Sequence, residues 1–224
     1  MARPGSVAGS GSRGVAGIVP AAGAGVRLGG GIPKAWRLVG GRPMVAYAVD
    51  MLSAVCARVV VTAPPGFDVP DVGAVVVAGG VTRSDSVRLA LAALDESVEH
   101  VLVHDAARPF APDAVAVRVL DALRAGEQAV VPVLPVADTV KVVDGGGYVV
   151  RTCDRGALRI VQTPQGFARE LLVRAHASGD DATDDAGLVE ALGVRVATVA
   201  GDPDGAKITT PAELAAAQAR TVAR

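Results

Sequence analysis

A loop rich in glycine and cations follows the first apolar run of the chain. Residues 20–34 read PAAGAGVRLGGGIPK and contain five glycines, two cations and no acidic residue. Glycines let backbone N–H groups approach a phosphate or the edge of a base without an intervening Cβ. Arg27 could bind phosphate oxygens through its guanidinium fork, and Lys34 could add a compact charge. The loop therefore favours a nucleotide site, although its composition also allows a surface loop without a ligand.

The loop does not match the three best-known phosphate-binding patterns. Gly23, Gly25 and Gly29 are spaced GxGxxxG, whereas the dinucleotide fingerprint requires GxGxxG at the start of a helix. Lys34 is followed by Ala35, so the GxxxxGK[ST] pattern of P-loop proteins is absent. The HRD and DFG elements that accompany a kinase glycine loop are absent as well. A nucleotide site in this chain must belong to another class.

Further cations lie in segments that follow predicted strands or end a predicted hairpin. GGVTRSDSV at 79–87, HDAARPF at 104–110 and GAKIT at 205–209 each bring a cation to what we expect to be one edge of a sheet. The six cations of this kind are Arg27, Lys34, Arg83, Arg108, Arg155 and Lys207. Only three of the 22 cationic residues are lysines, so Lys34 and Lys207 are unusual choices in this chain.

These side chains fit phosphoryl or nucleotidyl transfer. In such reactions the protein mainly positions the reactants and neutralises charge around a metal-bound triphosphate. Asp105, at the end of a predicted strand, could contact a metal, a phosphate or a hydroxyl. The sequence has no paired-carboxylate, Ser-His-Asp or Cys-His set that would indicate other chemistry. Structural alternatives remain: an ion pair between Asp105 and Arg108, helix capping by residues 84–86, and a helix start at Thr183.

Composition and charge argue against several other classes. The 224 residues carry a formal charge of −1, which argues against a nucleic-acid binder with a broad basic face. Cys56 and Cys153 form no disulfide framework, and neither they nor the three histidines have the spacing of a zinc site. Residues 1–13 lack the apolar core of a secretory signal, so we expect a disordered leader. No apolar run reaches the length of a membrane span, and we expect a cytoplasmic protein without a membrane partner.

Short apolar runs alternate with amphipathic segments along residues 14–224, which we expect to form one domain. The predicted strands are 14–20, 57–63, 73–78, 100–104, 128–133 and 194–200. Their valine-rich, non-alternating sequences favour burial on both faces. The predicted helices cover 44–55, 87–94 and 116–123, and a last helix begins with the capping box of residues 210–213. We expect Pro43 in the first helical turn. The alternation predicts an α/β fold with a mostly parallel sheet.

Residues 135–160 break this alternation. Two β-rich runs, TVKVV and YVVRT, flank the turn DGGG, which is a hairpin signal. An isolated two-stranded hairpin is only marginally stable in water. We therefore expect this hairpin to pack against its own domain or against a second subunit.

Eight motifs, taken together, resemble those of one enzyme family. In order along the chain they are PAAGAGVRLGGGIPK, GGVTRSDSV, VLVHDAARPF, PVADTVK, DRGAL, TPQGF, ATDDA and AKITTPAE. With these motifs, residues 14–220 closely resemble the 2-C-methyl-D-erythritol 4-phosphate cytidylyltransferases of the non-mevalonate isoprenoid pathway. The resemblance implies a glycosyltransferase-A-like, Rossmann-type sheet. It also implies transfer of CMP from CTP to methylerythritol phosphate, with release of pyrophosphate and a requirement for Mg²⁺.

The resemblance implies roles for individual residues. Arg27 and Lys34 would stabilise the pentacoordinate transition state, and Arg155 and Lys207 would hold the acceptor phosphate for in-line attack. The residues that would surround CTP are Ala21, Ala22, Gly23, Gly80, Ser86, Asp105 and Ala106. The residues that would contact the acceptor are Asp105, Arg108, Thr139, Arg155, Thr183 and Lys207. The metal would be held chiefly by the CTP phosphates, with Asp105 nearby.

The hairpin is explained by the same resemblance. In the family this arm, residues 135–160 here, reaches across a homodimer, so Thr139 and Arg155 would serve the partner's site. Two departures from the family pattern are visible. Val81 stands where relatives often have an acidic or polar residue, and the run Gly29–Gly31 makes the loop more flexible than usual.

Other functions remain to be distinguished. A ribitol-5-phosphate cytidylyltransferase shares most of these motifs and differs mainly in the acceptor, and such discrimination can depend on few hydrogen bonds. A non-catalytic nucleotide-binding protein on the same fold would be expected to lack Arg27, Lys34 or Lys207, all of which are present. An enzyme fused to the downstream cyclase of the pathway would need a second domain, for which 224 residues leave no room.

Overall fold

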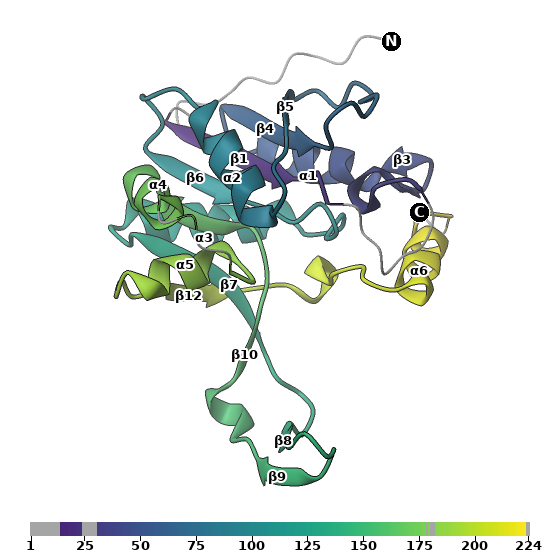
Figure 1. The fold of residues 1–224 in the computed structure, drawn as a ribbon, viewed down its shortest axis with the longest axis vertical. Coiled ribbons are helices and arrows are strands. Elements are labelled where there is room, and N and C mark those ends of the chain that lie inside the picture. The colour runs from purple at the N-terminus through teal and green to yellow at the C-terminus, as the bar shows by residue number, and fades with distance from the viewer. Residues whose placement is uncertain (1–13, 24–30, 178, 180–181, 223–224) are drawn as a thin grey trace.

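An eight-stranded sheet forms the centre of the structure, a computed structural model that describes residues 14–23, 31–177, 179 and 182–222 (Figure 1). The strand order is β10-β7-β11-β6-β1-β4-β5, and β12 also pairs with β7. The strands are β1 (Val15–Pro20), β4 (Arg58–Ala63), β5 (Val75–Ala78), β6 (His100–Val103), β7 (Ala129–Pro135), β10 (Arg159–Val161), β11 (Gln165–Ala168) and β12 (Ala197–Ala200). The predicted leader, residues 1–13, lies outside the described residues.

Most strand pairs of the sheet are parallel. Strand β1 is parallel to β4 and β6, β4 to β5, and β7 to β12, whereas β11 is antiparallel to β6 and β7, and β10 to β7. The six predicted strands are all present, with bounds shifted by up to three residues. Strand β11 is not predicted, because its sequence QGFA has no β-branched residue. Its Gly166 lets helix α3 approach, since a Cβ there would lie 2.4 Å from Val119.

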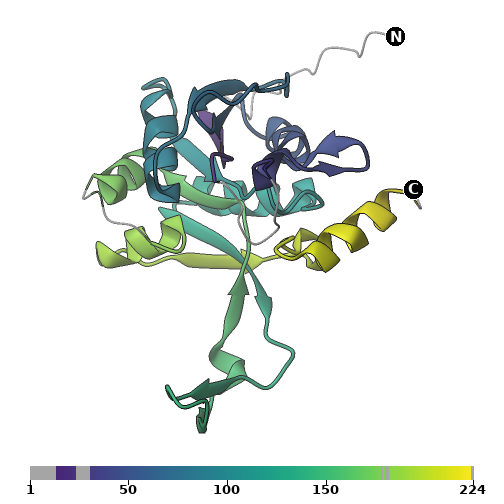
Figure 2. The ribbon, with the colours of Figure 1, turned by 45° about the vertical axis from the view of Figure 1, so that its right-hand side comes forward.

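Helices cover both faces of the sheet (Figures 1 and 2). They are α1 (Met44–Ser53), α2 (Arg83–Ala92), α3 (Asp113–Arg124), α4 (Arg169–His176), α5 (Asp185–Ala191) and α6 (Pro211–Val222). Alternate residues of β1 show the division: Val15 and Val19 pack with α1 and α3, whereas Ala16 and Ile18 pack with α2, α4 and α5. Burial on both faces is therefore confirmed for β1. The expectation is wrong for β5, where Val75 and Val76 are exposed because β5 is an edge strand.

The helix starts differ in detail from the prediction. Pro43 is the residue before α1, with an extended ψ of 140°, and not part of its first turn. Helix α2 begins at Arg83, and its N-cap is Thr82. The Thr82 hydroxyl accepts from the Asp85 backbone N–H at 3.0 Å, and the Asp85 carboxylate accepts from the Thr82 N–H at 3.3 Å. Residues 84–86 therefore lie inside the first turn, and only Asp85 takes part in the capping box.

The capping box predicted for the last helix is confirmed. The Glu213 N–H donates to the Thr210 hydroxyl at 3.3 Å, and the Thr210 N–H donates to the Glu213 carboxylate at 2.8 Å. This helix, α6, packs beside the small β2 (Leu38–Val39) and β3 (Arg42–Pro43) ribbon, in a satellite core with Val39 and Ile208. The chain that leads into α6 passes the end of β6, where the Ile208 N–H donates to the Ala107 carbonyl.

The predicted hairpin is confirmed and projects from the body (Figures 1 and 2). Its base is the antiparallel pair β7 and β10, and its tip is a separate sheet of β8 (Lys141–Val143) and β9 (Val149–Thr152). Gly147 adopts a φ of +84° in the DGGG turn, where a side chain would be strained. Tyr148, Val149 and Val150 are 76%, 60% and 62% exposed, so the tip carries an apolar surface that the described chain does not cover.

Candidate active site

A cleft of about 480 Å³ lies beyond the carboxyl ends of β1, β5 and β6. Ligands of open α/β sheets bind at this edge. Its lining comes from the segments after these three strands, from the end of the glycine loop and from the approach to α6. The lining residues are Pro20, Ala21, Ala22, Gly23, Lys34, Ala35, Gly80, Val81, Thr82, Arg83, Ser86, Asp105, Ala106, Ala107 and Lys207.

The start of the glycine loop is bonded to the sheet, and the segment after the loop is bonded to that start. The Ala21 N–H donates to the carbonyl oxygen of Thr62, at the end of β4, at 3.0 Å. The buried Trp36 donates its indole N–H to the Ala21 carbonyl at 3.1 Å. Because Trp36 belongs to the 3₁₀ turn η2 (Lys34–Trp36), this bond holds Lys34 beside the start of the loop. Arg27 lies outside the described residues.

A glycine pair forms the opposite wall of the cleft. A Cβ at Gly79 would lie 2.2 Å from the Cβ of Ala22, and a Cβ at Gly80 would lie 2.3 Å from that of Asp85. A larger residue at position 79 would therefore push Ala22 away, and one at position 80 would push away the first turn of α2. The Ser86 hydroxyl accepts from the Gly80 N–H at 3.1 Å and donates to the Thr82 carbonyl at 3.0 Å. These contacts fix the wall against α2.

Asp105 is the centre of a cluster of charges. The Lys207 ammonium lies 2.6 Å from its carboxylate, and Arg83 and Arg108 each lie 3.9 Å away. Burial disfavours the charged carboxylate, but Lys207, Arg83 and Arg108 outweigh burial and hold the pKa of Asp105 at about 2. Asp105 is therefore ionised at neutral pH, with cations on three sides.

The segment that carries Lys207 is tied to the end of β6. The Ile208 N–H donates to the Ala107 carbonyl at 2.8 Å. The buried Arg108 donates to the Gly205 carbonyl at 2.7 Å and to the Val161 carbonyl at 3.3 Å. Arg108 thus joins the Lys207 segment to the base of the arm, a structural contribution that its position in the sequence did not indicate.

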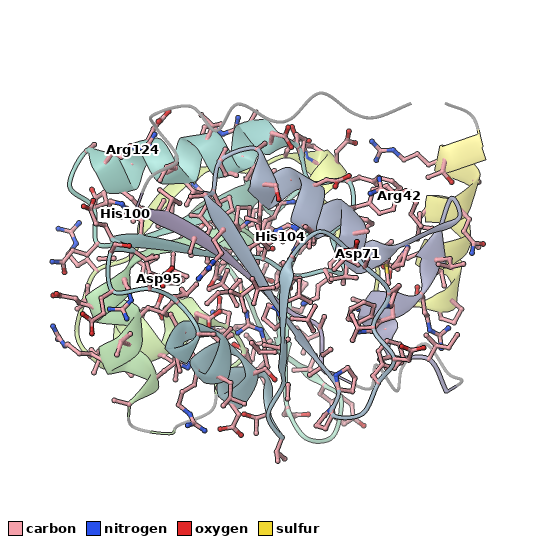
Figure 3. The ribbon with its side chains drawn as sticks, turned by 90° about the horizontal axis from the view of Figure 1, so that it is seen from above. Arg42, Asp71, Asp95, His100, His104 and Arg124 are labelled. Atoms are coloured by element: carbon pink, nitrogen blue, oxygen red, sulfur yellow. The ribbon has the colours of Figure 1, made fainter. Side chains whose placement is uncertain are left out.

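A buried hydrogen-bond chain fixes the backbone of Asp105. Its N–H donates to the Thr163 hydroxyl at 3.0 Å, and that hydroxyl lies 2.9 Å from Nδ1 of His104. Burial lowers the pKa of His104 to about 4, so the ring is neutral at pH 7. In Figure 3, His104 lies near the middle of the molecule, whereas His100, at the other end of β6, lies toward its edge.

A second, smaller cleft of about 180 Å³ adjoins the first. Its lining residues are Arg83, Asp105, Arg108, Val161, Gln162, Thr163, Gln165, Thr183, Asp184 and Lys207. Arg83, Asp105 and Lys207 line both clefts. The arrangement can therefore hold two anionic ligands that meet at one cluster of charges.

Residues 15–222 of the chain match the family model of 2-C-methyl-D-erythritol 4-phosphate cytidylyltransferase. The chain belongs to this family. A cytidylyltransferase of that name from Frankia casuarinae is 54% identical over 222 residues, which cover 92% of this chain and 80% of the relative. Another, from Nocardia farcinica, is 53% identical over 213 residues, which cover 91% and 92%. The crystal structure of the Thermus thermophilus enzyme is 42% identical, with a TM-score of 0.81 over 92% of this chain and 98% of that one.

These similarities confirm the predicted family, fold class and activity. The chain is a cytidylyltransferase, a kind of nucleotidyltransferase, of isoprenoid biosynthesis. The family match favours a methylerythritol phosphate acceptor over ribitol phosphate. Within the described ranges, no helix combines the length and the apolar composition that a membrane crossing requires.

The larger cleft of this cytidylyltransferase brings together most of the residues predicted to act on the nucleotide. Those that line it are Ala21, Ala22, Gly23, Lys34, Gly80, Ser86, Asp105 and Ala106. Lys207, predicted to hold the acceptor phosphate, lines both clefts. Arg108 and Thr183, predicted to contact the acceptor, line the smaller cleft. Arg155, in the turn η3 (Arg155–Ala157), and Thr139 are exposed on the arm and line neither cleft. The individual roles of all these residues stay predictions.

Sequence reasoning left several residues of the site unassigned. Thr163, Gln165 and Asp184 line the smaller cleft, and Gln165 donates to the Asp184 carboxylate at 2.7 Å. The motifs TPQGF and ATDDA contain these residues, so the motifs were visible, but nothing in them says which side chain faces a ligand. Arg83 stood out as a cation, and the structure places it in both clefts.

The cytidylyltransferase cleft fits a metal that arrives with the nucleotide. Among the described residues, no group of three or more His, Cys, Asp or Glu could hold a metal ion. The described lining of the larger cleft contains one carboxylate, that of Asp105. Mg²⁺ is typically bound by one or two carboxylates together with substrate phosphates. This donor set matches that mode and not a metal held by the protein alone.

Proposed function

We propose that the larger cleft binds CTP and the smaller cleft binds 2-C-methyl-D-erythritol 4-phosphate. The observation that carries this assignment is the shared cluster of Arg83, Asp105 and Lys207, where the two clefts meet. A phosphate of each ligand would lie near these charges. The glycine wall and the backbone of residues 21–23 allow the close approach that a flat base and a ribose need.

In the proposed reaction a phosphate oxygen of the acceptor attacks the α-phosphorus of CTP. The new P–O bond forms as the bond to the β-phosphate oxygen breaks, so pyrophosphate leaves with that electron pair. The other product is 4-diphosphocytidyl-2-C-methyl-D-erythritol. Lys34 and Arg27 neutralise the negative charge of the pentacoordinate phosphorus. Lys207, positioned by Asp105, binds the acceptor phosphate in line with the leaving group.

Mg²⁺, when bound, supplies positive charge to the triphosphate and makes pyrophosphate a better leaving group. Asp105 is the side chain that would hold it, together with the phosphates of CTP. The cationic side chains of this chain would neutralise the rest of the negative charge on the phosphates.

We further propose that the arm, residues 135–160, completes the site of a second subunit in a homodimer. Two observations support this proposal. The tip exposes Tyr148, Val149 and Val150, an apolar surface of the kind that marks an interface. Arg155 and Thr139 lie on the arm, outside both clefts of their own chain.

Mixing inactive variants tests the exchange of arms. In a heterodimer of Arg155→Ala and Lys34→Ala subunits, the intact body of one chain would meet the intact arm of the other, so up to about half of the wild-type activity should return. The matched control mixes Lys34→Ala with Lys207→Ala, two changes in the body, and should recover none. No recovery in confirmed Arg155→Ala/Lys34→Ala heterodimers would contradict the exchange.

Pyrophosphate release tests the function itself. With CTP and Mg²⁺, we expect release with methylerythritol phosphate as the acceptor and none with ribitol 5-phosphate. Release with ribitol 5-phosphate alone would agree with the proposed mechanism but would show that the acceptor is ribitol 5-phosphate. Binding of CTP without release in either case would contradict catalysis. The cytoplasmic location also stays a prediction, which cell fractionation can test.

A further inference from the structure

A buried chain of polar side chains runs from α4 and α5 to the charges around Asp105. Nε2 of His176 lies 3.0 Å from Oδ1 of Asp185, and the Arg83 guanidinium lies 2.7 Å from Oδ2 of Asp185. The same Arg83 nitrogen lies 3.9 Å from Asp105. Asp185 is 0% and His176 3% exposed. The three helices α2, α4 and α5, which carry this chain, lie on one face of the sheet (Figures 1 and 2).

Both oxygens of the Asp185 carboxylate have a fixed partner. Burial disfavours its charge, but the hydrogen bond from His176 and the charge of Arg83 lower the pKa of Asp185 below its ordinary value. Asp185 is therefore an anion within the body of the protein, and losing the pairing would leave Arg83 without its hydrogen-bonded counter-ion. Arg83 is attracted by three carboxylates, those of Asp185, Asp105 and Asp184, and Asp185 is the one that accepts a hydrogen bond from it.

Asp185 and Asp105 both attract the Arg83 guanidinium, and Asp184 adds a weaker attraction. Without the charge of Asp185, the balance would shift toward Asp105, and the guanidinium would move toward Oδ1 of that carboxylate. Lys207 contacts the other oxygen, Oδ2, at 2.6 Å, so its pair with Asp105 would stay in place. The shift would therefore change where the Arg83 guanidinium lies between the two clefts.

We propose that Asp185 is a positioning residue for the transfer reaction, which holds Arg83 away from Asp105 and so fixes the Arg83 guanidinium at the junction of the two clefts. His176 orients the Asp185 carboxylate for this purpose. The second terminal nitrogen of Arg83 is buried and has no hydrogen-bond partner among the described residues, so Asp185 is the side chain that fixes the guanidinium by a hydrogen bond there. The inference rests on the proposed function of the two clefts and deepens it.

The first test is Asp185→Asn, which keeps the shape of the side chain and removes its charge. We expect kcat to fall about 10-fold, since substitutions along such networks change coupling by amounts of this order. KM for CTP should change less than about 3-fold, because the wall that would face the base is untouched. The matched control is Val189→Ala, which removes packing from a fully buried residue of the same helix and should retain kcat.

A double-mutant cycle separates positioning from mere loss of stability. If Asp185 acts through Arg83, adding Asp185→Asn to Arg83→Gln should reduce kcat no more than about 2-fold further. A destabilising role would instead reduce kcat equally in both backgrounds, and that result would overturn the inference. Wild-type kcat in Asp185→Asn would overturn it as well.

A second variant keeps the test decisive if Asp185→Asn does not fold. His176→Gln leaves the Asp185 charge in place and perturbs only its orientation. His176→Gln should lower kcat in the wild-type background and should not lower kcat further in the Arg83→Gln background. Absence of any loss, or an equal loss in both, would refute the positioning role. Failure of the proposed function is distinguishable, because the wild-type enzyme would then release no pyrophosphate.

Discussion

Removing the charge of Lys207 should raise the pKa of Asp105. Burial is the largest influence on this carboxylate and opposes its ionisation, and the Lys207 ammonium at 2.6 Å is the largest influence that favours it. The fall from an ordinary 3.8 to about 2 corresponds to roughly 2 kcal/mol of stability, since each pH unit is worth about 1.4 kcal/mol. In Lys207→Met, which keeps a long side chain, the pKa of Asp105 should rise by about 1 or more.

The lowered pKa of Asp105 determines how the stability of the fold changes with pH. Because the pKa of Asp105 is lower in the folded than in the unfolded protein, its carboxylate stabilises the fold above about pH 4, and this contribution is lost as the pH falls toward 2. Lys207→Met should therefore have a lower free energy of unfolding than the wild type at pH 7. The difference should shrink as the pH falls below about 4.

Two measurements check this prediction. Carbon-detected NMR of the side-chain carboxylates gives the pKa of Asp105 directly, and urea denaturation between pH 3 and 7 gives the difference in stability. Lys141→Met is the matched control, because it makes the same substitution on the arm, where Lys141 contacts Thr152, and should leave the pKa of Asp105 unchanged. An Asp105 pKa that stays at about 2 in Lys207→Met would refute the reasoning.

Three further predictions address other parts of the chain. Lys34→Ala should lose about 100- to 1000-fold in turnover with little change in stability, and near-wild-type turnover would remove Lys34 from the mechanism. Burial raises the pKa of the Cys56 thiol to about 12. Iodoacetamide should therefore modify Cys153 in the folded protein and leave the buried Cys56 unmodified. Equal modification of the two cysteines, measured by mass spectrometry, would contradict this prediction. The buried Gln162 side chain accepts a hydrogen bond from the Asp202 N–H at 2.9 Å and donates one to the Asp202 carbonyl at 2.8 Å. Gln162→Ala should therefore lower the free energy of unfolding by about 1–3 kcal/mol. An unchanged midpoint of urea denaturation would contradict this prediction.

The parts of the fold that local patterns encode were predictable. The capping box at Thr210 and the hairpin turn depend on residues within a few positions of each other, and both are present. Strand β11 was not predictable, because it is a strand by virtue of lying between β6 and β7 and not by its own β propensity. The exposure of β5 was missed for a similar reason, since nothing in a valine run says whether another strand lies beside it.

The N-cap of α2 shows how small local choices escape a sequence pattern. Thr82 is the residue before the helix and Ser84 is the second residue of the helix, and either type of residue can serve as an N-cap. The glycine pair before Thr82 and the contact of Ser86 with Gly80 fix where the chain turns, and so decide the cap. These constraints depend on the packing of Gly79 against Ala22, in a strand–loop segment nearly 60 residues away.

By itself the sequence determined the kinds of residue at the site, their motifs and the alternation of strands and helices. These properties are local, because propensity, capping and periodicity act over a few residues. Only the tertiary structure decided which charges meet. Lys207 and Asp105 pair across 102 positions of the chain, and so do Arg83 and Asp185. Arg108, predicted to contact the acceptor, also donates to two backbone carbonyls, a role that the sequence did not indicate. Each cation had several possible anionic partners, and folding selects among them by the burial and distance that the whole sheet imposes.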